Sequence, residues 1–147
     1  MIKKHKDLLL EKLNKLNKEI SSYKNETDIW KVSGGITNPP GNLCLHLCGN
    51  LQHYIGALIG KTSYLRNRDS EFSRKNVSRH DLLMEINITE EMIAHVFDAL
   101  TEDNLKKPFP EKTFGEDATN ADAILECETH FTYHLGQINY HRRILGL

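Results

Sequence analysis

The sequence of 147 residues has few cysteines and no excess of charge of either sign. Its three cysteines include no CxxC pair and cannot all pair with one another. Cys44 and Cys48 stand four residues apart and could in principle supply two thiolate ligands, but small buried residues in a reducing compartment are the favoured interpretation. The 19 basic and 20 acidic side chains nearly cancel. Without a basic stripe, nucleic acid is not expected as a partner.

Long apolar runs are also missing. No run approaches the roughly 20 residues that a membrane-spanning helix needs, so no membrane partner is expected. The opening stretch MIKKHKDLLLEKLNKLNKEI has basic residues before several leucines, yet charges return at once and no small-residue cleavage site follows. It predicts an amphipathic helix in a cytoplasmic protein. At 147 residues the sequence is about the size of one ordinary domain, so we expect a single domain over residues 1–147.

Helical periodicity, in contrast, is abundant, and no segment predicts a strand. Apolar spacings of three and four predict helices over about residues 3–24, 40–61, 79–103 and 120–145. Ser78 is the expected N-cap of the third helix, and either Thr119 or Asn120 that of the fourth. The expected buried stripes are Leu9, Leu13, Leu16, Ile20 and Tyr23; Leu47, Leu51, Tyr54 and Leu58; Leu82, Ile86, Ile93, Phe97 and Leu100; and Ile124, Cys127, Phe131, His134, Ile138 and Leu145.

Four amphipathic helices of this length predict an all-α fold, a four-helix bundle. The connections WKVSGGITNPPGN, TSYLRNRDSEFSRKNV and KKPFPEKTFGED are long enough to cross the end of such a bundle. Helices that are neighbours in sequence need not then be neighbours in space.

Two histidines in the last predicted helix, His130 and His134, form an HxxxH pair. One helical turn brings both imidazoles to one face, with Cβ atoms about 5–6 Å apart. His134 falls inside the apolar stripe, where an unpaired ring nitrogen would cost roughly 1–3 kcal/mol. The pair is therefore either two packed imidazoles with protein partners or half of a metal site.

The second predicted helix offers a third ligand. His46, Asn50 and His53 follow at steps of four and three and share one helix face. His46 or His53 could complete a site of three histidines, which leaves a coordination position open for water or a substrate thiolate. Zinc or nickel is expected first, and iron or cobalt would also accept such ligands. His141 is the alternative ligand on the last helix.

The segments NPPGNLCLHLCGNL and HFTYHLGQINYHRR resemble the DinB/YfiT-like superfamily of metal-dependent enzymes, in the branch with GN-L-xxHLxGN and tHxxYHxGQI signatures. The resemblance implies a four-helix bundle, commonly a homodimer, that holds one divalent metal ion. Carried over to this sequence, the ligands are His46, His130 and His134. His53 then becomes a bystander or a neighbour of the ligands, and Gln137 could orient a ligand or bound water.

The resemblance also implies a reaction class. Some relatives are S-transferases that use a low-molecular-weight thiol such as bacillithiol or mycothiol, and others are called hydrolases. The sequence offers no strong general base, because Glu128 would point about 200° away from His130 around the helix. Asn50 and His53 are the candidate polar neighbours of the reacting group.

The segment YLRNRDSEF has two interpretations. Arg66, Arg68 and Glu71 could border the mouth of the site and bind an anionic substrate, or they form a solvated loop with a local ion pair. Three functions therefore stand as hypotheses: a metal-dependent S-transferase or hydrolase acting on a small molecule, a binding or sensing protein without turnover, and a helical assembly module.

Overall fold

The structure is a computed structural model that describes residues 1–146, and within them it is all-helical, as predicted. No strand forms in these residues, where one isolated antiparallel bridge joins Pro108 to Thr119. Four long helical segments account for most of the chain: α1 (Ile2–Ser22), α2 (Pro40–Leu51) continued by the π-helix η2 (Gln52–Ile59), α4 (Arg79–Ala99) and α6 (Asn120–Leu145). The short elements are the 3₁₀ helix η1 (Glu26–Trp30), α3 (Arg68–Ser73) and α5 (Glu102–Lys106).

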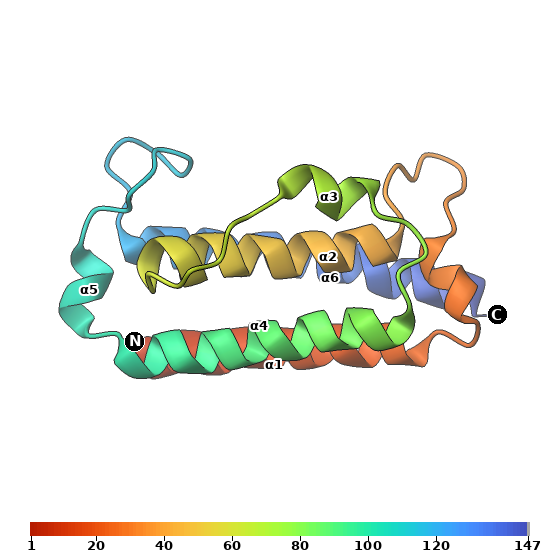
Figure 1. The fold of residues 1–147 in the computed structure, drawn as a ribbon, viewed down its shortest axis with the longest axis horizontal. Helices are drawn as coiled ribbons and strands as arrows, with labels where there is room; N and C mark the ends of the chain where they lie inside the picture. Colours follow the sequence, from red (N-terminus) through yellow and green to blue (C-terminus); the bar gives the residue numbers. More distant parts are fainter. Residues whose placement is uncertain (147) are drawn as a thin grey trace.

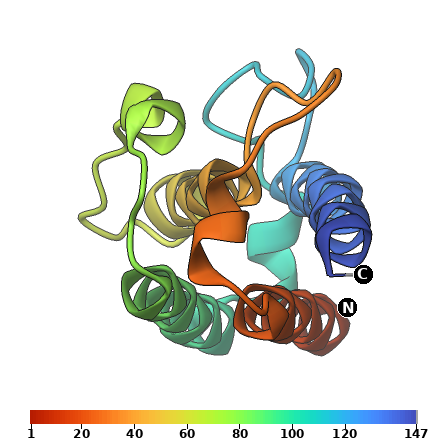
Figure 2. The same ribbon diagram turned by 90° about the vertical axis from the view of Figure 1, so that its right-hand side faces the viewer.

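The four long segments lie side by side in two layers (Figures 1 and 2). α2 and α6 form one layer, and α1 and α4 form the other. α1 packs mainly against α4 and α6, and α2 packs against the same two helices, so α1 and α2 lie diagonally across the arrangement. The segment after η2 runs back along the outside of α2 before α4 begins, and α3 lies within it (Figure 1).

The ends of two long helices follow local side-chain chemistry. Ser78 Oγ accepts a hydrogen bond from the amide of Asp81 at the start of α4. At the start of α6, Thr119 and Asp122 form a reciprocal capping box. Both contacts satisfy amide groups that a helix leaves unpaired in its first turn. The structure thus confirms Ser78 and selects Thr119 over Asn120 as the cap of α6.

α1 is amphipathic as predicted, with all five expected positions buried against the core. Lysines and glutamates cover its opposite face. No helix among residues 1–146 is long and apolar enough to cross a membrane.

The buried face of α2 and η2 corrects one prediction. Leu47 and Leu51 are buried as expected, but Tyr54 and Leu58 are only partly buried. Ile55 and Ile59 take their places in the core. The reason is the π-helix, whose i→i+5 hydrogen bonds wind more residues into each turn than an α-helix. Residues four apart in η2 therefore stay on one face. The α-helical period of 3.6 instead predicts Tyr54 and Leu58, one position before Ile55 and Ile59, on the buried face.

Two other expected elements differ in extent. The helix predicted over residues 79–103 ends at Ala99, and α5 follows as a separate helix capped by Thr101. The polar connection before α4 contains α3, which is capped by the side chain of Asn67. This short helix carries Glu71, whose side chain is buried against α2.

Candidate metal centre

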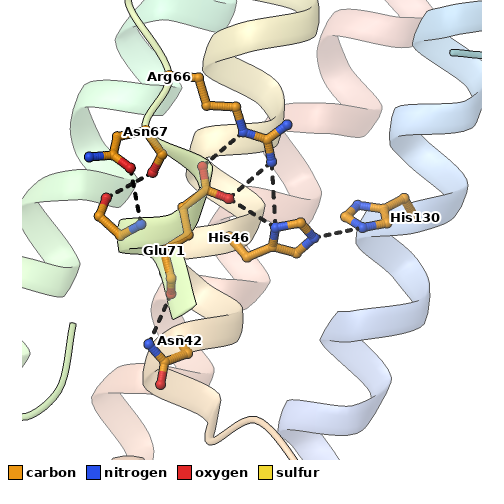
Figure 3. A network of polar contacts seen from close by, with 7 residues as sticks. Asn42, His46, Arg66, Asn67, Glu71 and His130 are labelled. Atoms are coloured by element: carbon orange, nitrogen blue, oxygen red, sulfur yellow. Dashed lines mark hydrogen bonds and ion pairs between the residues drawn. The ribbon is translucent and has the colours of Figure 1, made fainter. Parts of the chain in front are cut away.

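Three histidines from two neighbouring helices meet at one point. His46 comes from α2, and His130 and His134 come from successive turns of α6. One nitrogen of each ring lies within 4.8 Å of the others, a spacing that could hold a metal ion. The Nε2 atoms of His46 and His130 are 3.0 Å apart (Figure 3). His46 is buried and the other two rings are partly buried.

A carboxylate fixes the orientation of His46. Glu71 Oε1 lies 3.0 Å from His46 Nδ1, and Arg66 donates two hydrogen bonds of 2.9 Å to the Glu71 carboxylate (Figure 3). A carboxylate accepts but cannot donate, so Nδ1 of His46 carries a proton and Nε2 is the atom turned toward the other histidines. Carboxylates hold metal-binding histidines in this way.

His134 is oriented in the same manner by a residue from its own helix. Gln137 Oε1 lies 2.7 Å from His134 Nδ1. If the amide oxygen accepts, Nδ1 of His134 is the donor and its Nε2 lone pair remains free. His130 differs from both rings, because its Nδ1 is buried and has no hydrogen-bond partner within residues 1–146. Packing and the contact with His46 hold this third ring.

The electrostatic surroundings keep two of the imidazoles neutral. Burial, together with the neighbouring imidazoles and the guanidinium groups of Arg66 and Arg68, lowers the pKa of His130 to about 4. Burial also lowers the pKa of His134, although the Gln137 hydrogen bond acts in the opposite direction. Neutral imidazole is the form that binds a metal ion. The donor chemistry therefore fits a divalent transition metal.

The Glu71 carboxylate stays charged although it is buried. Burial alone would favour its protonated form, but hydrogen bonds from His46 and Arg66 and the charge of Arg66 lower its pKa below the ordinary value. The carboxylate is thus fully engaged by two partners. This makes it an orienting group for His46 rather than a free base.

Two residues of the GNLCLHLCGN segment explain how Glu71 reaches His46. The Asn42 side-chain amide donates a hydrogen bond of 2.9 Å to the backbone oxygen of Glu71 (Figure 3). It donates a second one of 2.7 Å to the backbone oxygen of Arg74, and the two bonds tie α3 to α2. Gly49 provides the space, because a Cβ at that position would overlap the Glu71 carboxylate. Asn42 and Gly49 are therefore parts of the site, because they allow Glu71 to reach His46.

Two cavities open beside the histidines. A cavity of about 250 Å³ is lined by His46, His130, Asn50, Tyr54, Arg66, Arg68, Phe114, Glu126 and Cys127. A second, of about 480 Å³, is lined by His134 and Gln137 and by mostly apolar side chains that include Ile36, Leu43, Tyr133, Tyr140 and Ile144. The cluster thus separates a polar space from a more apolar one.

The remaining predicted residues fall into two groups. Asn50 and Arg68 line the smaller cavity, with Asn50 buried and Arg68 exposed. His53 is not brought to the cluster: its Nε2 lies 3.6 Å from Glu111, and its ring packs on Tyr54. In the segment YLRNRDSEF, Arg66 and Glu71 form an ion pair, and Arg66 and Arg68 line the smaller cavity.

His141 forms its hydrogen bonds with groups outside the three-histidine cluster. The Tyr23 hydroxyl is 2.9 Å from its Nδ1, and its Nε2 is 2.8 Å from the carbonyl oxygen of Lys31. Because a carbonyl only accepts, Nε2 carries the proton and the Tyr23 hydroxyl donates to Nδ1. Both nitrogens are satisfied, so the ring joins α6 to the end of α1 as a structural group.

Glu128 points away from the cluster, as its place in the helix predicts. Its carboxylate lies 2.6 Å from His5 Nδ1 on α1. With Glu71 held by two partners, neither of these buried carboxylates is free to accept a proton beside the histidines. The candidate site is therefore rich in nitrogen ligands, and neither buried carboxylate is available to it as a base.

All three cysteines are free and buried. A hydrogen bond with Cys48 and burial raise the pKa of the Cys44 thiol well above its ordinary value. Burial raises the pKa of Cys127 to about 12. Protonated thiols are poor metal ligands, which agrees with the expectation that these cysteines are small packing residues.

The sequence analysis missed the role of Glu71 toward His46. Its only signal was an arginine and a glutamate five residues apart in a polar segment, which predicts a local ion pair equally well. The contact with His46 depends on α3, a helix of six residues that periodicity does not reveal.

Comparison with known families identifies the family of this protein but gives no activity. A family model described as "Protein of unknown function (DUF1572)" matches residues 2–146. No curated protein matches the sequence. Since the match spans nearly the whole chain, including all three histidines and Glu71, the protein belongs to the DUF1572 family.

Proposed function

We propose that the protein is a DinB/YfiT-like metal-dependent enzyme in which His46, His130 and His134 bind one divalent metal ion. The substrate would be a small molecule, and the reaction a thiol-dependent S-transfer. The DUF1572 match and the two histidine segments support the superfamily assignment. The two-layer arrangement of long helices and the diagonal connection from α1 to α2 support the crossed four-helix bundle that the superfamily implies.

One observation carries the metal assignment: two of the three rings are fixed through Nδ1 by groups outside the cluster. Glu71 holds His46 and Gln137 holds His134, so each Nε2 is directed to where a shared ion would lie. In the structural His141 both ring nitrogens have protein partners outside the cluster, whereas in His46 and His134 only Nδ1 has one. The Nε2 atoms of His46 and His130 are 3.0 Å apart, close enough either to share a proton in a hydrogen bond or to bind one cation.

The engagement of both buried carboxylates near the cluster favours S-transfer over hydrolysis, and the remaining carboxylate of the smaller cavity, that of Glu126, is exposed. A divalent ion at this position would act as a Lewis acid and stabilise the anionic form of a bound thiol or water. Hydrolysis further benefits from a nearby group that accepts and returns a proton. Both buried carboxylates close to this part of α6 are already engaged, Glu71 by His46 and Arg66, and Glu128 by His5. A thiol needs less help, since its ordinary pKa of about 8.5 is far below that of water.

A homodimer is also proposed, on the basis of the superfamily resemblance and of apolar side chains on the outer face of α6. Leu125, Tyr133, Tyr140 and Ile144 are each more than half exposed. Exposed apolar surface of this kind on one helix is typical of interaction sites. Size-exclusion chromatography with light scattering measures the mass directly, and a monomer at all concentrations would contradict the proposal.

Metal content is the first test of the function. The purified protein should bind one divalent ion per chain, and His46→Ala and His134→Ala should each lose stoichiometric binding in elemental analysis. His53→Ala is the matched control, because α-helical periodicity predicts His53 on the same face as His46, yet in the structure it contacts Glu111. Equal metal content in His46→Ala and the wild type would refute the assignment.

Turnover is the second test. The metal-loaded protein is incubated with small thiols and a panel of electrophiles, and thioether formation is followed by mass spectrometry. Metal-dependent product that disappears in His134→Ala supports S-transfer. Release of hydrolysis products without thiol consumption would replace it with the hydrolase alternative, and tight thiol binding without any product would favour a sensing role.

A further inference from the structure

We propose that the cavity of about 250 Å³ beside His46 and His130 binds an anionic group of the substrate, a carboxylate or a phosphate, through Arg68. Calling this ligand a substrate rests on the proposed function, because the anion would lie next to the proposed metal ion. The anion site itself does not require the metal.

Arg68 is the cationic side chain of this cavity that forms no ion pair within the described residues. Its guanidinium lies 5.3 Å from the centre of the Phe72 ring, and it has no carboxylate partner among residues 1–146. Packing on an aromatic face limits the motion of a long side chain while leaving its N–H groups free to donate. A planar guanidinium in this state is suited to bind a carboxylate or phosphate through paired hydrogen bonds.

Arg66 lines the same cavity but has a different role. Its Nε and one terminal nitrogen both donate to Glu71, so its charge is balanced locally. The pair contributes little net charge to the cavity. The attraction for an anion therefore depends on Arg68 more than on Arg66.

Asn50 supplies a second polar group toward the ligand. Its side chain lines the cavity and is buried, yet its Oδ1 has no hydrogen-bond partner within the described residues. Leaving such a group unpaired costs about 1–3 kcal/mol. Because this oxygen only accepts, a ligand that carries a donor, such as the P–OH of a protonated phosphate, recovers this energy, and a carboxylate does not.

Glu126 lines the cavity as well, and it opposes an anion. It is exposed, one turn before His130 on α6, and has no cationic partner in the described part of the chain. The negative charge of Glu126 allows a test that distinguishes anion binding by Arg68 from a merely structural role of Arg68. Removing the positive charge should weaken anion binding, whereas removing the negative charge should strengthen it.

The decisive experiment uses the full-length, metal-free protein. Inorganic phosphate, propionate and the neutral analogue 1-propanol are titrated while amide and side-chain signals are followed by NMR. Phosphate or propionate should shift the Arg68 signals and propanol should not, and the tighter anion identifies which chemistry the cavity takes. Arg68→Gln should weaken binding about tenfold or more, since a charge-assisted hydrogen bond contributes about 1.5–3 kcal/mol.

Two further variants separate charge from folding. Arg143→Gln is the matched control, because Arg143 is also exposed and lies 5.4 Å from the centre of an aromatic ring, that of Tyr140, but outside this cavity. It should leave anion affinity unchanged, and Glu126→Gln should increase it. An Arg68→Gln protein that binds anions as tightly as the wild type would overturn the proposal, and so would equal losses in Arg68→Gln and Arg143→Gln.

A metal-loaded arm distinguishes this proposal from the function on which it rests. With cobalt bound, 3-mercaptopropionate and neutral 3-mercaptopropanol are compared through the cobalt–sulfur absorption. The anionic thiol should bind about tenfold more tightly in the wild type but not in Arg68→Gln. Failure to bind cobalt refutes the metal centre and leaves the metal-free result standing. Cobalt binding without any preference for the anionic thiol, together with no anion binding to the metal-free protein, refutes the anion site alone.

Discussion

The carboxylate of Glu71 on α3 lies 3.0 Å from Nδ1 of His46 on α2, and this contact joins the short crossing helix to the three-histidine cluster. Both side chains are almost completely buried. A buried carboxylate is stable only when it is paired and hydrogen-bonded, and here His46 and Arg66 provide both. The same contact fixes which nitrogen of His46 faces the cluster.

Glu71→Gln is therefore expected to weaken divalent metal binding by about 10- to 100-fold, the usual effect of losing such an orienting partner. An amide in place of the carboxylate no longer stabilises the Nδ1–H form of His46 to the same extent. Competition with a chromophoric chelator measures the affinity. Glu111→Gln is the control, because Glu111 faces His53 instead and should leave the affinity unchanged. Equal affinities for Glu71→Gln and the wild type would show that Glu71 has no part in the site.

Gly49→Ala tests the same contact from the other side. The added methyl group would overlap the Glu71 carboxylate, so either α3 moves away or the carboxylate turns from His46. We expect a loss of about 1–3 kcal/mol in the free energy of unfolding, as for other overpacked positions, together with weaker metal binding. Chemical denaturation and the chelator competition measure the two effects.

Gly136→Ala is the matched control for this substitution. Gly136 is also helical, but nothing lies within 4 Å of a Cβ built on it. Alanine there should be neutral or stabilise the protein by about 0.5–1 kcal/mol, because glycine is the weaker helix former. If both variants behave alike, space at Gly49 is not what the contact between α3 and α2 requires.

The residues that sequence alone could identify are those whose position follows from helix periodicity. The spacing of His130 and His134 fixes a shared face for any helix, and the face of α1 with Leu9, Leu13 and Leu16 follows in the same way. The choice of His46 over His53 came from the family resemblance, since the two share a face and periodicity cannot separate them. In the structure His46 joins the cluster and His53 contacts Glu111.

The residues that sequence could not place depend on non-local contacts. Tyr54 was expected in the core, and Ile55 lies there instead, because the π-helical winding of η2 changes which residues share a face. Glu71 reaches His46 only because the chain returns along α2, Asn42 binds the backbone of α3, and Gly49 leaves room. None of these three conditions has a periodic signal.

His141→Gln should separate structural histidines from ligands. His141 is satisfied by the Tyr23 hydroxyl and the Lys31 carbonyl, so its loss should lower the free energy of unfolding by about 1–3 kcal/mol and leave the metal content unchanged. Tyr23→Phe removes one of the two contacts and should have a smaller effect in the same direction. A loss of stoichiometric metal in His141→Gln would place this residue among the ligands and contradict the assignment of His134.

The lowered pKa of His130 predicts how the metal-free protein responds to acid. Its pKa of about 4 in the folded chain lies below the ordinary value of 6.5, so between these values the unfolded chain binds a proton that the folded chain does not. The stability that His130 contributes is therefore complete above about pH 6.5 and is lost as the pH falls toward 4. Glu71, whose pKa is also lowered, adds its own loss only below its ordinary value of 4.5.

Comparison of the wild type with His130→Asn isolates the histidine, because the carboxylates are common to both proteins. The free energy of unfolding of the wild type should fall more steeply between pH 6.5 and 4, and the difference between the two proteins should be constant at higher pH. An NMR titration of the His130 ring should have its midpoint near pH 4, well below that of an exposed histidine. Parallel stability curves, or a His130 midpoint at the ordinary value, would show that the ring is not held neutral by burial and by its cationic neighbours.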